Sequence, residues 1–186
     1  MQKYSVVRKL QVTTILAYLT GIVIGFYVPE SLAYTLLEAV KELAGKTFRE
    51  NPWEFALEIF IHNMEAVIIT VLLSPLVLIP MLAVFVNGVI LGVAINYLLE
   101  SRSWLFVFLA LAPHGVLEIP TVLCVYTLSI GFGADLWRSL LGKDREAWKK
   151  SGIKLVKGLI ASVALLALSA FIEAFITPAL ITMCKC

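Results

Sequence analysis

The chain alternates long apolar stretches with short polar ones, and five of the apolar stretches are long enough to cross a bilayer. A membrane-spanning helix needs about 20 mainly apolar residues. The pattern predicts spans at about 10–28, 53–73, 78–99, 104–130 and 156–181. A short amphipathic helix is expected at about 31–44, where apolar residues recur at helical spacing. We therefore expect an all-α fold, a polytopic helical membrane protein with residues 1–186 in one membrane domain.

Composition and charge agree with this interpretation and suggest an orientation. Hydrophobic residues make up 60% of the chain and charged residues 15%, whereas soluble proteins carry about 25% charged residues. The net charge of +2 is too small to suggest a nucleic-acid partner. Lysine and arginine gather near the N-terminus and in a loop at about 132–155, and cytoplasmic loops are rich in these residues. Four predicted crossings separate the two groups, so both are expected in the cytoplasm and the C-terminus outside.

The fourth predicted span contains residues that are unusual at membrane depth. Pro113, Gly115 and Pro120 predict a break or kink, because a proline inside a helix lacks an amide hydrogen and clashes with the preceding turn. Broken helices in membranes are tolerated where they line a cavity or are covered by protein. His114 and Glu118 lie four residues apart, so a continuous helix would place them on one face.

The end of this span and the loop after it are predicted from glycines and apolar residues. Gly131 and Gly133 are expected to stop the helix, and Leu136, Trp137 and Leu140 suggest a short interfacial helix within the basic loop.

Several polar side chains fall inside the predicted spans, where an ionisable group indicates a functional site. Asn87, near the middle of the third span, needs a hydrogen-bond partner, which is either another helix or a ligand. On the second span, the first two turns can project into water, and the deeper polar residues are expected to face the bundle. The predicted buried polar centre consists of His114, Glu118, Glu173, Asn87, Asn63, His62 and Glu65.

Two glycine pairs have the spacing that lets membrane helices approach closely. Gly21 and Gly25 lie in the first span, and Gly88 and Gly92 in the third. The alternative is a chance occurrence in apolar runs. Because a bundle needs only one such face internally, the two pairs predict a homodimer or larger oligomer.

The sequence resembles the stage II sporulation protein M family. The resemblance rests on Pro113-His114-Gly115 followed by Glu118, on Asn87-Gly88 with Gly92, and on Glu173 followed by Thr177-Pro178. It implies an integral membrane protein. In spore-forming bacteria such a protein works as a membrane scaffold with a peptidoglycan-degrading machine during engulfment, and relatives also occur in bacteria and archaea that form no spores.

Three functions remain open at this point. The first is a membrane scaffold in which the polar residues lock helices together, with membrane lipid, a second copy and other envelope proteins as partners. The second is a transporter or channel for a small solute, ion or lipid. The third is an intramembrane metal-dependent enzyme with His114, Glu118 and Glu173 as ligands, against which stands the absence of an HExxH or GxSxG motif. No cofactor is predicted.

Overall fold

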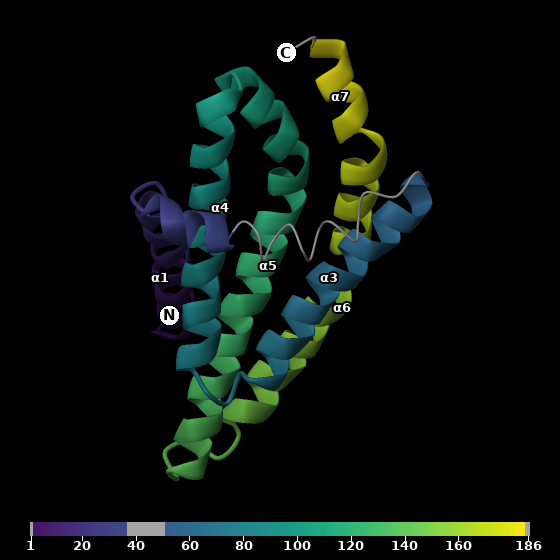
Figure 1. Ribbon diagram of the computed structural model, residues 1–186. Helices are drawn as coiled ribbons and strands as arrows, with labels where there is room; N and C mark the ends of the chain where they lie inside the picture. Colours follow the sequence, from purple (N-terminus) through teal and green to yellow (C-terminus); the bar gives the residue numbers. More distant parts are fainter. Residues whose placement is uncertain (1, 37–50, 185–186) are drawn as a thin grey trace.

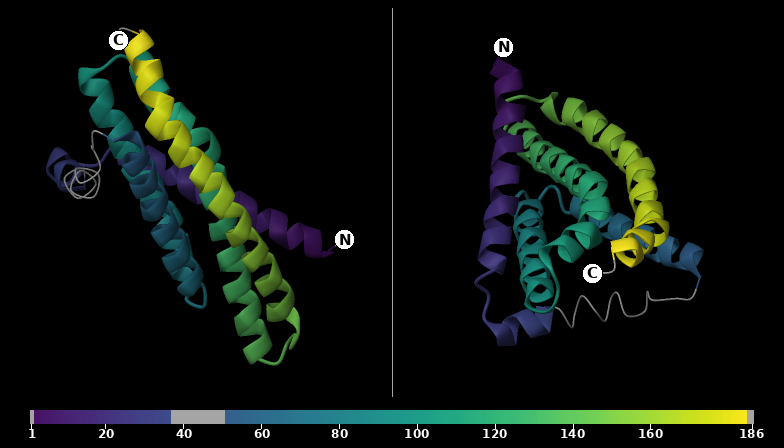
Figure 2. Two further views of the ribbon diagram at one scale, coloured as in Figure 1. Left: turned by 90° about the vertical axis from the view of Figure 1, so that its right-hand side faces the viewer. Right: turned by 90° about the horizontal axis from the view of Figure 1, so that it is seen from above.

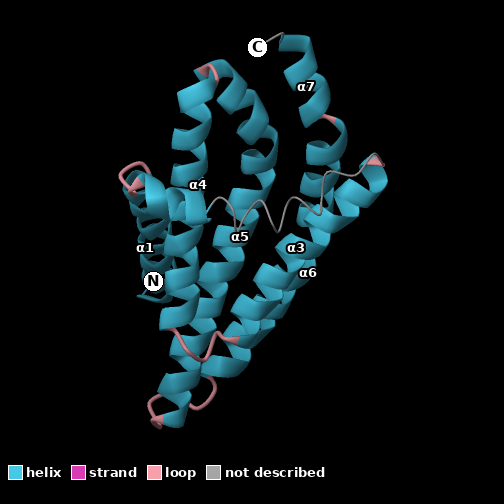
Figure 3. Ribbon diagram, in the orientation of Figure 1, coloured by secondary structure: helices cyan, strands magenta, loops and turns pink. Residues whose placement is uncertain are grey.

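The computed structural model describes residues 2–36 and 51–184, which are helices joined by short turns, with no strand among them (Figures 1 and 3). The helices are α1 (Gln2–Gly25), α3 (Pro52–Leu72), α4 (Leu78–Ser101), α5 (Trp104–Leu140), α6 (Ala147–Phe175) and α7 (Thr177–Cys184). Residues 30–36 are also helical, where the amphipathic helix was predicted to start. The rest of that predicted helix lies outside the described residues.

Among the described residues, four helices are long and apolar enough to cross a membrane: α3, α4, the part of α5 from Gly115 to Leu140, and the run from Ala147 to Met183. A shorter apolar stretch, Trp104–Pro113, precedes the third of these within α5. The prediction of an all-α, polytopic membrane protein is confirmed. The count of five is approximate, because α1 is not among the four. Its first turns are polar and include Arg8 and Lys9.

The two glycine pairs pack against each other, and they join α1 to α4. A Cβ atom added to Gly21 would collide with the Phe85 carbonyl oxygen, and one added to Gly92 with the Ile22 carbonyl oxygen. Residue numbers rise together on the two helices at these contacts, so α1 and α4 cross while running in the same general direction. Both predicted close-approach faces are therefore used inside one chain. The homodimer was predicted because one face was expected to be left for a second copy, and the glycine pairs no longer support it.

The fourth span was predicted to break or kink, and α5 does not break, since it stays helical through Pro113, Gly115 and Pro120. The helix instead changes direction in its upper half in Figure 1, as expected where a proline ring crowds the preceding turn. Beside Pro120, the Thr121 hydroxyl donates a 2.6 Å hydrogen bond to the Leu117 carbonyl. The 37 residues of α5 correspond to roughly 56 Å of helix, well beyond a hydrocarbon core of about 30 Å.

The basic loop is also much shorter than predicted, because Gly131 and Gly133 do not stop α5. A Cβ atom at Gly133 would collide with the Ser74 carbonyl oxygen, so this glycine allows α5 to approach the turn between α3 and α4. The helix ends at Leu140, and Gly142, two residues further on, has a φ of 73° that suits glycine. The amides of Gly142 and Lys143 bond back to the carbonyls of Ser139 and Arg138, which is the Schellman pattern.

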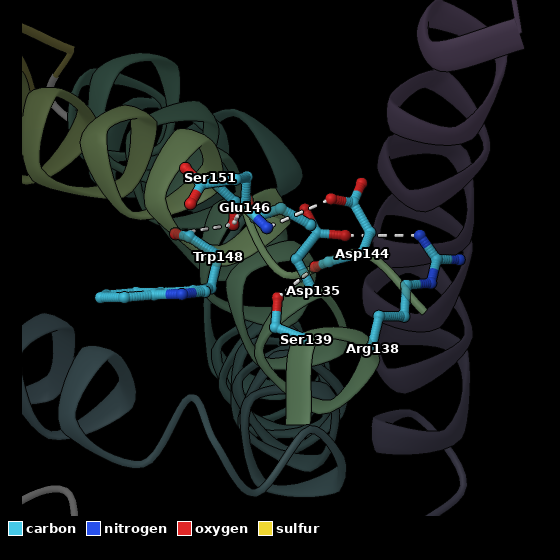
Figure 4. Close-up of polar contacts among 8 residues, drawn as sticks. Asp135, Arg138, Ser139, Asp144, Glu146, Trp148 and Ser151 are labelled. Atoms are coloured by element: carbon cyan, nitrogen blue, oxygen red, sulfur yellow. Dashed lines mark hydrogen bonds and ion pairs between the residues drawn. The ribbon is translucent and has the colours of Figure 1, made fainter. Parts of the chain in front are cut away.

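Polar contacts hold the turn between α5 and α6 together (Figure 4). The Ser139 hydroxyl donates to the Asp144 carbonyl at 2.6 Å, and the Asp144 carboxylate accepts from the Glu146 amide at 3.2 Å. Ion pairs one turn apart, such as Arg138 with Asp135, are exposed and add little stability. The predicted interfacial helix is thus the last turns of α5, and the Trp137 indole donates to the Pro75 carbonyl at 2.8 Å.

Figure 2 shows that α7 continues α6 as one long, curved rod. The helix is interrupted at Ile176, directly before Thr177-Pro178. One small core joins α3, α5 and α6 around Val67, Val125 and Leu166, and a second joins α1, α4 and α5 around Tyr18, Val84 and Tyr126. Because α5 contributes to both clusters, it is the central helix of the bundle.

Replacing Gly21 by alanine is expected to destabilise the fold by about 1–3 kcal/mol, because the new methyl group meets a rigid backbone carbonyl. Thermal unfolding of the purified protein in detergent, followed by circular dichroism, measures the effect. Gly131→Ala is the control, since its Cβ atom would lie 3.8 Å from the Leu10 side chain, an ordinary contact. Equal stability of the two variants would contradict the close packing of α1 on α4.

Candidate functional site

A hydrogen bond between α3 and α5 is the basis of the candidate site. The side-chain amide nitrogen of Asn63 donates a hydrogen bond of 2.5 Å to Oε2 of Glu118, and both residues are partly buried. Phe60, Met64 and Val67 place one face of α3 on α6. Asn63 follows Phe60 by three residues on the helix, and its side chain reaches α5 beside that packed face. The bond therefore pairs a carboxylate with an amide inside the bundle.

A small cavity lies on the other side of Glu118. Its volume is about 20 Å³, and it is lined by residues of three helices: Tyr18, Val84, Asn87, Glu118, Ile119, Val122, Leu123 and Tyr126. A water molecule needs about 10–15 Å³ and two to four polar partners. The cavity thus has room for one water next to a carboxylate and two phenol rings. We refer to Tyr18, Asn63, Asn87, Glu118 and Tyr126 as the Glu118 cluster.

Two residues predicted for the buried centre lie elsewhere. The side chains of His62 and Glu65 are exposed on α3. Successive residues of a helix are rotated by about 100°, so the rotation that brings Asn63 to α5 turns His62 and Glu65 away from it. The prediction that the deeper polar residues of this helix face the bundle is therefore wrong for His62 and Glu65.

Asn87 contributes to the cavity without being buried. Its side chain is exposed on α4 and lines the cavity. The predicted hydrogen bond from Asn87 to another helix is absent among the described residues. The residue therefore lies at the border between the cavity and the outer surface of the bundle.

The remaining members of the predicted centre, His114 and Glu173, are placed only in part. Residue 114 belongs to α5, one turn before Glu118, and its side chain lies outside the described part of the structure. Glu173 is half-buried on α6, between Phe171 and Phe175, whose rings stack at 4.5 Å and contact Trp53 of α3. The meeting of His114, Glu118 and Glu173 stays a prediction.

Sequence reasoning missed the two tyrosines of the cluster. Tyr18 is 7% exposed and Tyr126 is 2% exposed, and both belong to the core around Val84. A signal for each was available. Tyr18 precedes Gly21 by nearly one turn, so it shares the face on which α1 approaches α4. Tyr126 follows Glu118 by eight residues, which places it on the same face of α5.

The chemistry open to this site is hydrogen bonding and proton exchange by a carboxyl group at membrane depth. Among the residues that the structure describes, no three His, Cys, Asp or Glu side chains lie close enough to hold a metal ion. Glu118 and Glu173 could contribute carboxylate oxygens, but the described residues do not bring them together with a third ligand.

These features define a class of protein: a polytopic, all-helical membrane protein whose central helix carries a hydrogen-bonded carboxyl group. The model of the family described as stage II sporulation protein M matches residues 14–178. The chain belongs to this family, as the resemblance of its motifs indicated. Neither a curated protein nor a solved structure matches the chain significantly.

A double-mutant cycle is expected to measure the bond between α3 and α5. Asn63→Ala and Glu118→Ala should each destabilise the protein, and the two should be coupled by about 0.6–1.7 kcal/mol, the range of hydrogen bonds between membrane helices. Unfolding by denaturant in mixed micelles gives the four free energies. Pairing Glu118→Ala with Thr13→Ala serves as control, because the exposed Thr13 hydroxyl bonds only within α1. Additive effects of the Asn63 and Glu118 variants would contradict the bond.

Proposed function

We propose that the protein is an integral membrane scaffold, an accessory protein that holds other membrane or cell-envelope proteins in place. The observation that carries the proposal is the hydrogen bond between Asn63 and Glu118 beside a cavity of only about 20 Å³. In hydrocarbon, a carboxyl group is costly unless it is hydrogen-bonded. Here the bond ties α3 to α5, so the polar group acts as a lock between helices.

The size of the cavity favours the lock over a conduit. A pathway for a solute needs a chain of sites or waters across the bilayer, whereas the space beside Glu118 holds about one water. Half of its lining residues are apolar, namely Val84, Ile119, Val122 and Leu123. A rigid bundle of this kind can present a fixed surface to partner proteins.

We also propose that the N-terminus and the turn between α5 and α6 lie in the cytoplasm, with the C-terminus outside. Leu10 of α1 lies beside Gly131 of α5, at 3.8 Å from a Cβ atom added there. This contact supports placing Arg8 and Lys9 at the same end of the bundle as the basic turn after α5. Positive charge at one end favours the cytoplasmic side.

The scaffold proposal is tested with Glu118→Gln in purified protein and in liposomes. The amide oxygen still accepts from Asn63, so folding and assembly should stay close to wild type. Proton flux into liposomes that carry wild-type protein should equal that into empty liposomes. Glu146→Gln, at an exposed position in the turn before α6, serves as control. A wild-type proton flux that Glu118→Gln abolishes would support a carrier and contradict the scaffold.

The orientation is tested with reporter fusions in a bacterial host. Alkaline phosphatase, which is active only outside the cytoplasm, should be active when fused after residue 186. It should be inactive when the fusion follows Gly142, at the end of α5. The reverse pattern, or equal activity at both positions, would contradict the proposed orientation.

A further inference from the structure

One face of α3 carries polar residues at mid-membrane depth with nothing from the described chain packed on it. His62 is the central residue of a 21-residue helix, Pro52–Leu72, that can cross the membrane. His62 and Glu65 are exposed, and neither has a hydrogen bond to another described residue. Lipid cannot satisfy an imidazole or a carboxyl group at this depth. Another polar surface must therefore cover them in the membrane.

The exposed face of α3 has the spacing of a helix–helix seam. His62, Glu65, Ile69 and Leu72 follow one another at intervals of three, four and three residues, which is the heptad spacing of coiled coils. Ile69 is 55% exposed and Leu72 is 71% exposed. We call these four residues the α3 stripe.

The stripe points away from the rest of the bundle. The residues that pack α3 on α6 are Phe60, Met64 and Val71, and the stripe lies roughly opposite to them on the helix. In Figure 1, α3 lies in front of α6. Only 17% of the apolar window of α3 is buried, against 28–33% for the other three candidate spans. Among these helices, α3 therefore has the most surface left for a partner.

We propose that two copies of the chain pair side by side through the α3 stripe, with His62 of each copy donating a hydrogen bond to Glu65 of the other. This inference concerns the outer face of α3 and does not rest on the Glu118 cluster or on the proposed function. It also differs from a dimer built on the glycine pairs, which are occupied within one chain.

The chemistry of the stripe favours a second copy as the occupant. An imidazole donor and a carboxyl acceptor lie one turn apart on the same face, so the face is complementary to itself. Copies of one chain insert in the same orientation, and their α3 helices are therefore parallel. A two-fold axis along the membrane normal then forms the bond from His62 to Glu65 twice. Polar pairs of this kind hold membrane helices together, while Ile69 and Leu72 close the apolar part of the seam.

Disulfide cross-linking in native membranes tests the pairing. The three cysteines, Cys124, Cys184 and Cys186, are first replaced by serine, and single cysteines are then introduced at Ile69 or Leu72. Oxidation should give a species of twice the chain mass. Ile68→Cys is the matched control, because Ile68 is 43% exposed on the same helix but lies at the edge of the stripe, turned by about 100° from Ile69. We expect at least a tenfold lower yield at Ile68.

A second experiment distinguishes association through the His62–Glu65 hydrogen bonds from nonspecific association of α3 helices. His62→Ala with Glu65→Ala should weaken association in lipid bilayers about tenfold, because two symmetric hydrogen bonds are lost. Energy transfer between labelled copies, measured at several protein-to-lipid ratios, gives the constant. The exchange His62→Glu with Glu65→His should restore association, since donor and acceptor are kept. Thermal unfolding checks that each variant is folded.

Four outcomes would overturn the proposal. For cross-linking, these are equal yields at Ile68 and Ile69, no product at Ile69 or Leu72, and a product that joins the chain to a different protein. For association in bilayers, the fourth is a constant that replacing His62 and Glu65 by alanine leaves unchanged.

Discussion

The structure depends on one constraint of the bilayer: a polar group at membrane depth must find its partner within protein, because lipid offers none. Buried threonines meet this constraint within their own helix. Thr14, Thr70 and Thr127 each donate to the carbonyl four residues earlier, at 2.8 Å. Asn63 and Glu118 meet it between helices, and this bond fixes α3 against α5. The polar residues thus determine which helices must be neighbours.

A second constraint is the close approach of backbones where no hydrophobic force drives helices together. In a membrane, association relies on packing and hydrogen bonds, so small residues decide which faces can touch. Gly21 and Gly88 allow α1 to lie directly on α4, and Gly133 allows α5 to lie on the turn after α3. With both neighbours fixed in this way, α5 becomes the central helix, and Glu118 lies at the meeting point of α3, α4 and α5.

Much of the outer surface is apolar and suits lipid, whereas one face of α3 carries exposed polar side chains. Large exposed side chains such as Leu78 on α4 and Ile160 on α6 are apolar and suit lipid. His62 and Glu65 on α3 do not, and this contrast supports the pairing face proposed for α3. The proposed scaffold would need both a fixed interior and such a face, and the Asn63–Glu118 bond and the exposed His62 and Glu65 lie on different sides of α3.

Motifs in the sequence indicated the family. Hydrophobic patterning by itself determined the helical class and the positions of the second and third spans to within two residues. Each of these depends on local composition and on a bilayer of known thickness. The ends of α5 needed tertiary structure, because glycine both terminates helices and permits close packing. Gly133 lies within α5 and permits close packing on the Ser74 carbonyl oxygen. Gly142 follows the end of α5 and has the positive φ that is typical of helix termination.

Likewise, the sequence favoured a bundle-facing role for His62, Asn63 and Glu65 alike, and it did not show which of them the packing would turn inward. A helix can rotate about its axis without changing its hydrophobic pattern when apolar residues surround it on most sides. Only the packing of Phe60 and Met64 on α6 fixed that rotation. It turned Asn63 toward Glu118 and left His62 and Glu65 on the outside.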